Sequence, residues 1–228
     1  MTEIESKSII QKVLKAASRK ISADFKFKQL TSGHINQTFW VKNNSEQLIL
    51  QKLNSSVFKN LENINQNILL VGEQLRKSGY ADEILELIPF SNEEFLFEYE
   101  WRIFKYVENT QTFLKVQSTE QAFAAAQSLS FFHSHISDLN HDKITDSIHG
   151  FLDFEKRFIE FENAIEKADK TRLNRAEGEI NYLIENKNIL EDWLNLIPQI
   201  PNRIIHADPK ISNFLFDESD TNKVAALI

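Results

Sequence analysis

The amino-acid sequence predicts an α+β protein with a β-rich N-terminal lobe, residues 1–105, and a mainly helical C-terminal lobe, residues 106–228. Three observations lead to this prediction. Apolar residues alternate with polar ones along several segments before residue 105, which is typical of half-buried strands. From Gln117 onward the apolar spacing becomes helical, and short strand-like segments return after Pro201.

The N-terminal lobe begins with a short amphipathic helix and continues as a small sheet that carries a second helix. The first helix is predicted over SIIQKVLKAAS, and three strands follow within residues 25–54, separated by a Ser-Gly turn and the polar break KNNSEQ. The segment 55–79 predicts a helix that Ser55 or Ser56 caps and Gly79 ends. Two further strands are expected in EILELIPF and EFLFEYEWRIFKYVE, around the polar turn SNEE.

Helices make up most of the predicted C-terminal lobe. The first, over STEQAFAAAQSLSFFHSHISDLN, opens with Ser118 and has Glu120 in its first turn. Further helices are expected over residues 152–169 and 170–197, followed by a proline-containing exit. NRIIHAD and SNFLFDESDTNKVAALI are interpreted as short strands that flank a polar loop.

Composition and charge narrow the range of functions. Apolar residues make up 42% of the 228 residues, which is enough for an ordered core. The formal net charge of −7 argues against a nucleic-acid partner, and the absence of cysteine excludes disulfides and thiolate zinc sites. The N-terminus lacks the apolar core of a signal peptide, and no apolar run approaches the ~20 residues that span a membrane. We therefore expect a soluble, cytoplasmic protein with no membrane partner.

The loop HADPKISN, residues 206–213, carries the residue types that phosphoryl transfer requires. Asp208 offers a carboxylate that could orient or deprotonate an attacking hydroxyl, and Asn213 offers an amide oxygen for a metal ion on a triphosphate. Lys210 could place a positive charge on the transferring group, and His206 could brace the loop through hydrogen bonds. The alternative is an ordinary polar turn in which Asp208 and Ser212 cap local backbone groups.

The pattern H-x-D-x-K-x-x-N in this loop resembles the catalytic loop of protein kinases. The longer stretch IIHADPKISNFLFD resembles the aminoglycoside phosphotransferase/choline kinase superfamily, and within it the chain is most similar to the N-acetylhexosamine 1-kinase group. The stretches SGHINQTFWV, LILQKLNSSVF, EWRIFKYVENTQTF and FFHSHISDL extend this resemblance over nearly the whole chain. The resemblance implies a protein-kinase-like two-lobed fold, ATP and Mg²⁺ as cofactors, Asp208 as catalytic base and Asn213 as a magnesium ligand. Lys210 is the second catalytic candidate, on the charge argument above.

The chain departs from the pattern of this superfamily in three places. Ala207 stands where Asn or Gly is common, and Pro209 replaces the more usual Thr or Leu. The superfamily follows the loop with a strand that ends in a metal-binding Asp, whereas KVAALI reaches Ile228 before such a residue. We therefore expect a truncated C-terminal lobe, incomplete at its C-terminus, that exposes apolar surface and could self-associate there.

The resemblance places the nucleotide phosphates under SGHINQTFWV. Gly33 would allow close backbone approach, and His34, Asn36 and Thr38 would offer polar contacts. A plain hairpin is the alternative explanation of this stretch.

The strand LILQKLN would carry the cation for the α- and β-phosphates, and Lys52 is the candidate. Gln51 could point inward instead, because a shift of one residue exchanges the two faces of a strand. An acidic partner of Lys52 is expected from the helix within residues 57–78, where Glu62 and Glu73 are both candidates.

The segment FKYVEN, residues 104–109, resembles the hinge between the lobes, with Phe104, Tyr106 and Val107 as candidate adenine-binding residues. An ordinary linker would explain its composition equally well. Trp101 is expected in the core and Arg102 as surface support. Four histidines are interpreted as structural, since none forms a matched ligand pair: His133, His135, His141 and His149.

These observations favour an ATP- and Mg²⁺-dependent kinase that transfers the γ-phosphoryl group to a hydroxyl of a small molecule, such as an N-acetylhexosamine. An amino-alcohol or aminoglycoside acceptor is an alternative within the same chemistry. A truncated or degenerate protein that binds nucleotide without turnover is an alternative of another class, because loss of a metal ligand commonly costs ~10² or more in rate. A helical interaction protein would remain if the chain bound no nucleotide.

Overall fold

The structure is a computed structural model that describes residues 2–22, 24–31, 33, 35–44 and 46–228. The chain forms two compact units, the first comprising Met1–Ser147 with Ile204–Ile228 and the second Ile148–Arg203. The predicted α+β class is confirmed. The lobe boundary expected between residues 105 and 106 lies inside the first unit and stays a prediction.

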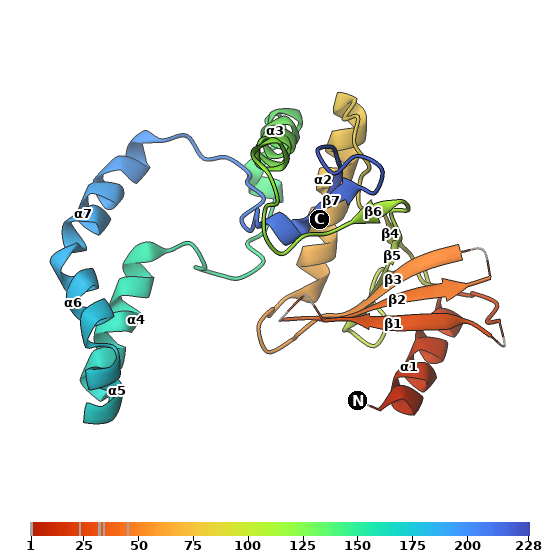
Figure 1. The fold of residues 1–228 in the computed structure, drawn as a ribbon, viewed down its shortest axis with the longest axis horizontal. Coiled ribbons are helices and arrows are strands. Elements are labelled where there is room, and N and C mark those ends of the chain that lie inside the picture. The colour runs from red at the N-terminus through yellow and green to blue at the C-terminus, as the bar shows by residue number, and fades with distance from the viewer. Residues whose placement is uncertain (1, 23, 32, 34, 45) are drawn as a thin grey trace. The chain divides into compact units, whose positions relative to one another are not determined.

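A five-stranded antiparallel sheet organises the first unit (Figure 1). Its strand order is β1-β2-β3-β5-β4. The three strands expected within residues 25–54 are confirmed, whereas the two later strands are shorter than predicted. The bounds are β1 (Lys26–Leu30), β2 (Gln37–Asn43), β3 (Glu46–Lys52), β4 (Leu87–Ile88) and β5 (Trp101–Lys105).

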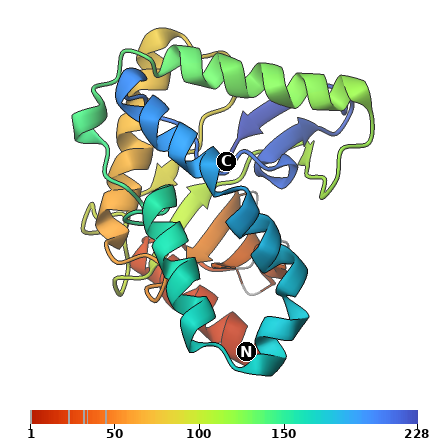
Figure 2. The same ribbon diagram turned by 90° about the vertical axis from the view of Figure 1, so that its left-hand side faces the viewer.

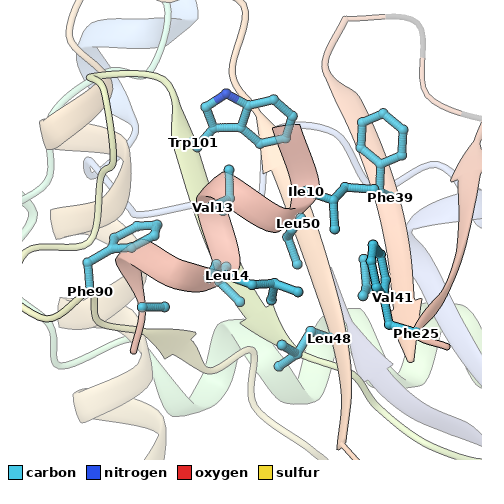
Figure 3. Close-up of a cluster of buried hydrophobic side chains, with 12 residues drawn as sticks. Ile10, Val13, Leu14, Phe25, Phe39, Val41, Leu48, Leu50, Phe90 and Trp101 are labelled. Carbon is cyan, nitrogen blue, oxygen red and sulfur yellow. The ribbon is translucent and has the colours of Figure 1, made fainter. Parts of the chain in front are cut away.

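Helix α1 (Glu3–Ala16) packs on one face of this sheet. A capping box fixes its start, since the Thr2 side chain accepts from the Glu5 backbone while the Glu5 side chain accepts from the Thr2 backbone. Its apolar residues meet those of three strands in one core (Figure 3). Because strand side chains alternate, Leu48 and Leu50 lie on the α1 face and their neighbours Ile49 and Gln51 lie on the opposite face. The most deeply buried members are Ile10, Val13, Leu14, Phe39, Val41, Leu48, Leu50 and Ile103.

Helix α2 (Leu61–Ser78) starts later than the sequence predicts. Asn60 is its N-cap and accepts from the backbone of Asn63 at 3.1 Å. Ser55 and Ser56 were expected in that role, but they lie in the preceding turn, where Asn54 accepts from Ser56. The predicted end is confirmed, because Gly79 adopts the left-handed conformation with φ of 74°.

A second, three-stranded antiparallel sheet follows, in the order β6-β7-β8. Its strands are β6 (Thr110–Gln111), β7 (Phe214–Asp217) and β8 (Val224–Leu227). Helix α3 (Thr119–His135), capped by Ser118 as expected, runs along this sheet (Figure 2). Residues of α3, β7 and β8 form one buried cluster: Ala125, Phe214, Phe216, Val224 and Leu227. The strand expected over NRIIHAD does not form, since residues 201–210 lie in loop conformations.

The second unit is helical and contains α4 (Phe154–Lys167), α5 (Lys170–Arg175), α6 (Glu177–Glu185) and α7 (Lys187–Leu196). The single helix expected over 170–197 is divided at Ala176 and Asn186, which leave helical geometry with φ of −114° and −103°. Short 3₁₀ helices occur at His141–Lys143, Ile197–Gln199 and Ile211–Asn213. In the part of the chain that the structure describes, no helix has the length and apolar character needed to cross a membrane.

Candidate functional site

The loop 206–213 brings three predicted site residues together. Lys210 Nζ lies 2.7 Å from Asp208 Oδ2, and Asn213 Nδ2 donates to the same carboxylate oxygen at 3.2 Å and to the Asp208 backbone carbonyl at 2.8 Å. The side chains of Lys210 and Asp208 are 57% and 59% exposed, so their ion pair adds little stability. The cluster is therefore open to a ligand rather than part of the core.

A left-handed residue gives the loop its shape. Ala207 has φ of 67°, which costs a non-glycine residue about 1–2 kcal/mol. After it, the Lys210 amide donates to the Asp208 carbonyl, and the Asn213 amide closes the 3₁₀ turn onto the Lys210 carbonyl. Asn and Gly, common at the position of Ala207 in similar loops, are the residue types that tolerate this conformation. The departure seen in the sequence therefore leaves a strained residue next to Asp208.

Two histidines hold the base of the loop. His206 braces it as expected, with its Nε2 paired to the backbone oxygen of Ile228 at 3.0 Å. The His206 amide donates to His133 Nε2 at 3.2 Å, and the Ile228 amide donates to the Asn213 carbonyl at 2.8 Å. Burial lowers the pKa of both His133 and His206, which favours the neutral form in which His133 accepts this bond. His133 is structural, and its support of the loop was not evident from the sequence.

The donor atoms of the loop suit a hard cation. Asp208 has a carboxylate, and no hydrogen bond reaches Asn213 Oδ1 from the residues that the structure describes. Mg²⁺ commonly takes one or two protein oxygens and completes its shell with phosphate oxygens and water. Three or more His, Cys, Asp or Glu side chains do not gather at any one point of the described chain. These two oxygens therefore fit a metal ion whose remaining ligands come from a nucleotide.

Lys52 lies on the face of the sheet against which α1 packs. It is the register partner of Trp101, whose side chain belongs to the α1 core, and its Nζ pairs with Glu100 Oε2 at 2.9 Å. This ion pair lowers the pKa of Glu100. The expectation that Lys52 pairs with Glu62 or Glu73 is wrong, because Lys52 pairs with Glu100 and the helix that carries the other two contacts Arg102 on the opposite face.

The opposite face of the sheet carries a polar network. Gln51 Nε2 donates to Thr38 Oγ1 at 3.1 Å, and Gln51 Oε1 accepts from Arg102 Nε at 3.0 Å and from Arg102 Nη2 at 2.6 Å. Arg102 was expected at the surface, but it is only 8% exposed. Its Nη1 donates to Asn65 Oδ1 of α2 at 2.9 Å. The register that the sequence left open thus places Gln51, and not Lys52, on the α2 side.

The remaining residues expected around the phosphates have different roles in the structure. Asn36 Oδ1 accepts from the Asn54 amide at 3.0 Å, which connects the residues after β3 to the start of β2. The space beside Gly33 is open, since a Cβ there would meet no atom within 4 Å. His34 lies outside the described residues. Among the described residues of this group, only Thr38 takes part in the polar network.

The segment expected to bind adenine is largely engaged with its own chain. Phe104 is buried within β5, between Ile49 of β3 and Leu87 of β4. The Tyr106 amide donates to the Gln47 carbonyl at 3.3 Å, and the Val107 carbonyl accepts from Thr110 Oγ1 at 2.8 Å. A ligand at this segment would therefore use side chains and the backbone groups that these bonds leave.

Three residues of these contacts were not predicted from the sequence: Arg102 and Asn65 of the polar network, and Glu100, the partner of Lys52. Arg102, Asn65 and Glu100 carried no motif, because each acts through contacts between elements far apart in the chain. A partial signal existed for Arg102, since WRIF places a charged residue inside an otherwise apolar strand.

The comparisons with known proteins identify a family and a fold for this chain. A sequence profile described as the phosphotransferase enzyme family matches residues 26–228. The fold is similar to a spectinomycin phosphotransferase solved with ADP and spectinomycin (12% identity, TM-score 0.62) and to an aminoglycoside phosphotransferase from Alicyclobacillus acidocaldarius (13%, 0.58). It is also similar to a thermostable mutant of an aminoglycoside phosphotransferase in a ternary complex with ADP and hygromycin B (14%, 0.51).

The matches to these structures extend over most of the chain. They cover 97%, 94% and 97% of it, whereas the chain spans 67%, 64% and 70% of the lengths of those proteins. At such identities the likeness shows a common fold.

Proposed function

Because this chain belongs to the phosphotransferase enzyme family, we propose that it transfers the γ-phosphoryl group of ATP to a hydroxyl group of a small molecule. The observation that carries this proposal is the meeting of Asp208, Lys210 and Asn213 in one exposed loop. A carboxylate, a cation and an amide oxygen in such a loop are the groups that phosphoryl transfer uses for positioning and charge stabilisation.

Each loop residue has a distinct part in the proposed reaction. Asp208 orients the acceptor hydroxyl and takes its proton as the new O–P bond forms and the bond to the β-phosphate oxygen breaks, releasing ADP. Lys210, now paired with Asp208, turns its charge toward the transferring group. Asn213 would hold Mg²⁺ through its Oδ1 atom, and the metal when bound supplies charge neutralisation for the phosphates.

The acceptor we favour is a sugar hydroxyl, with an N-acetylhexosamine as the first compound to test. The support is the similarity of IIHADPKISNFLFD and the four other stretches to N-acetylhexosamine 1-kinases. The second candidate is an aminoglycoside, because the spectinomycin and hygromycin B complexes have this fold.

The test is acceptor-dependent ADP release, measured with ATP and Mg²⁺ against N-acetylhexosamines, spectinomycin, hygromycin B and choline. Asp208→Asn should abolish the acceptor-dependent signal, a loss of ~10² or more. Asp138→Asn, which changes another exposed aspartate of the first unit, should keep it.

Two results would contradict the proposal. Nucleotide binding without transfer to any acceptor would favour a degenerate kinase-like protein. Equal activity of Asp208→Asn and the unchanged chain would show that Asp208 takes no part in the reaction.

A further inference from the structure

Arg102 carries a buried positive charge for which the described residues supply no acidic partner. It is 8% exposed, and the ion pairs among the described residues do not include it. All three of its nitrogen atoms donate hydrogen bonds, two of them to Gln51 and one to Asn65. Both acceptors are neutral amides, so the guanidinium satisfies its hydrogen bonds but keeps its full charge.

This arrangement is costly for the fold. Burial lowers the pKa of Arg102 to about 9, which shows how strongly the surroundings disfavour the charged form. The Phe104 ring, 4.7 Å from the guanidinium carbon, gives some compensation through its negative face. A neutral side chain of similar volume would fill the same space without this penalty. A buried charge with a perturbed pKa makes Arg102 a candidate functional residue.

The position of Arg102 indicates what the charge could serve. Trp101 and Ile103 belong to the α1 core, so Arg102 between them points to the other face. In both ribbon views α1 lies on one side of the five-stranded sheet, and β7 and β8, which follow the loop 206–213, lie on the other (Figures 1 and 2). The face that carries Arg102 is therefore the one turned toward the catalytic loop.

The network also joins three elements that a nucleotide would need in fixed positions. From α2, Asn65 accepts from Arg102 and donates to the Phe95 carbonyl at 2.9 Å. Gln51 of β3 accepts from Arg102 and donates to Thr38 of β2. Protein kinases connect the corresponding strand and helix by a Lys–Glu ion pair. Here one arginine and two amides make the connection, and within the part of the chain that the structure describes no carboxylate pairs with the arginine.

On the basis of the proposed function, we propose that Arg102 is the fixed positive charge of the phosphate site, in place of Lys52. Arg102 is a positioning residue, since it is buried and holds the Gln51 side chain on the face of the sheet opposite α1. Gln51 and Thr38, which are partly exposed, are the groups that contact the phosphates. The attraction of Arg102 for the phosphates acts through Gln51, in surroundings that screen charges less than bulk water does.

The decisive variant is Gln51→Glu, which keeps the shape of the side chain and gives Arg102 a carboxylate partner. Thermal stability should be retained or increased, because the buried charge is then paired. Affinity measured by calorimetry should fall about ten- to hundredfold for ATP, less for ADP, and by less than about twofold for adenosine. Arg102→Met should show the same gradation with phosphate number, which a purely structural role would not produce.

Lys52→Met and Arg19→Met are the control variants, because each removes one positive charge as Arg102→Met does. Arg19 pairs with Glu46, and Lys52 pairs with Glu100. Neither charge can therefore attract phosphates on the face of the sheet opposite α1. Both should change ATP affinity by less than about threefold. The inference is overturned if Lys52→Met weakens ATP binding as much as Gln51→Glu does, or if the Gln51→Glu loss is equal for ATP and adenosine. Absence of nucleotide binding in the unchanged chain would instead overturn the proposed function.

Discussion

At the scale of single residues, the strained backbone beside Asp208 is the feature with the clearest energetic consequence. Ala207 adopts φ of 67° because the chain must turn to present Asp208 after His206 has been fixed by His133 and Ile228. Residues held in this region persist only when their surroundings over-determine them. The bonds on both sides of Ala207 supply that constraint.

Ala207→Gly should raise the free energy of unfolding by about 0.5–1 kcal/mol. Glycine removes the left-handed penalty of about 1–2 kcal/mol, and the greater freedom of the unfolded chain offsets part of this gain. Urea denaturation measures the difference. The control is Ala126→Gly on the exposed side of α3, which should lower stability by about 1 kcal/mol. Losses of equal size at both positions would show that Ala207 is not strained.

Single residues also show what the sequence could and could not predict. The relation of Asp208, Lys210 and Asn213 was predictable, because all three lie within one loop and their spacing decides whether they meet. The partner of Lys52 was not, because it depends on which face α1 covers and on the register of β3 with β5. A one-residue uncertainty in register was enough to exchange Gln51 and Lys52.

At the scale of elements, the strongly periodic segments were predicted correctly and their ends less well. The first helix, the three strands within residues 25–54 and the helix after Ser118 all formed. The start of α2 was wrong, because Ser55 and Ser56 are good caps in isolation, whereas in the structure Ser56 donates to Asn54 and Ser55 donates to Glu100. NRIIHAD was expected as a strand from its apolar residues, but the bonds of His206 and the turn at Ala207 hold it as a loop.

Asn60→Ala should lower the free energy of unfolding by about 1 kcal/mol, because its side chain satisfies the Asn63 amide at the start of α2. Ser55→Ala is the control, since its hydroxyl donates only to the exposed Glu100 side chain, and it should change stability by less than about 0.5 kcal/mol. Thermal unfolding followed by circular dichroism distinguishes them. A larger loss of stability for Ser55→Ala than for Asn60→Ala would indicate that Ser55 caps α2, as predicted from the sequence.

At the scale of the molecule, the two units differ in how much they bury. The first contains the apolar clusters around α1 and α3, whereas α4, α5, α6 and α7 contain no buried residue. Large apolar side chains of the second unit are exposed, among them Ile159, Tyr182 and Ile189. Self-association through such surface, expected from the sequence, stays a prediction.

Amide hydrogen exchange should reveal this difference directly. Amides of α4 to α7 should exchange at least about 10²-fold faster than those of β2 and β3, because local opening there exposes little new apolar surface. Mass spectrometry of peptic fragments gives both rates. Equal protection would contradict the prediction. If the protection of the α4 to α7 amides weakened on dilution, a second copy of the chain would be what covers these helices.

The pairing of β6 with β7 has a consequence for synthesis on the ribosome. Thr110 pairs with Asp217, so roughly a hundred residues, including the whole second unit, are translated between the two strands. At ~5–20 residues per second, β6 waits about 5–20 s for its partner. During that interval the nascent chain already contains the five-stranded sheet, while α3 lacks the hairpin that covers it. The loop 206–213 thus forms only after the second unit has been translated, and a chaperone that shields α3 would assist its assembly.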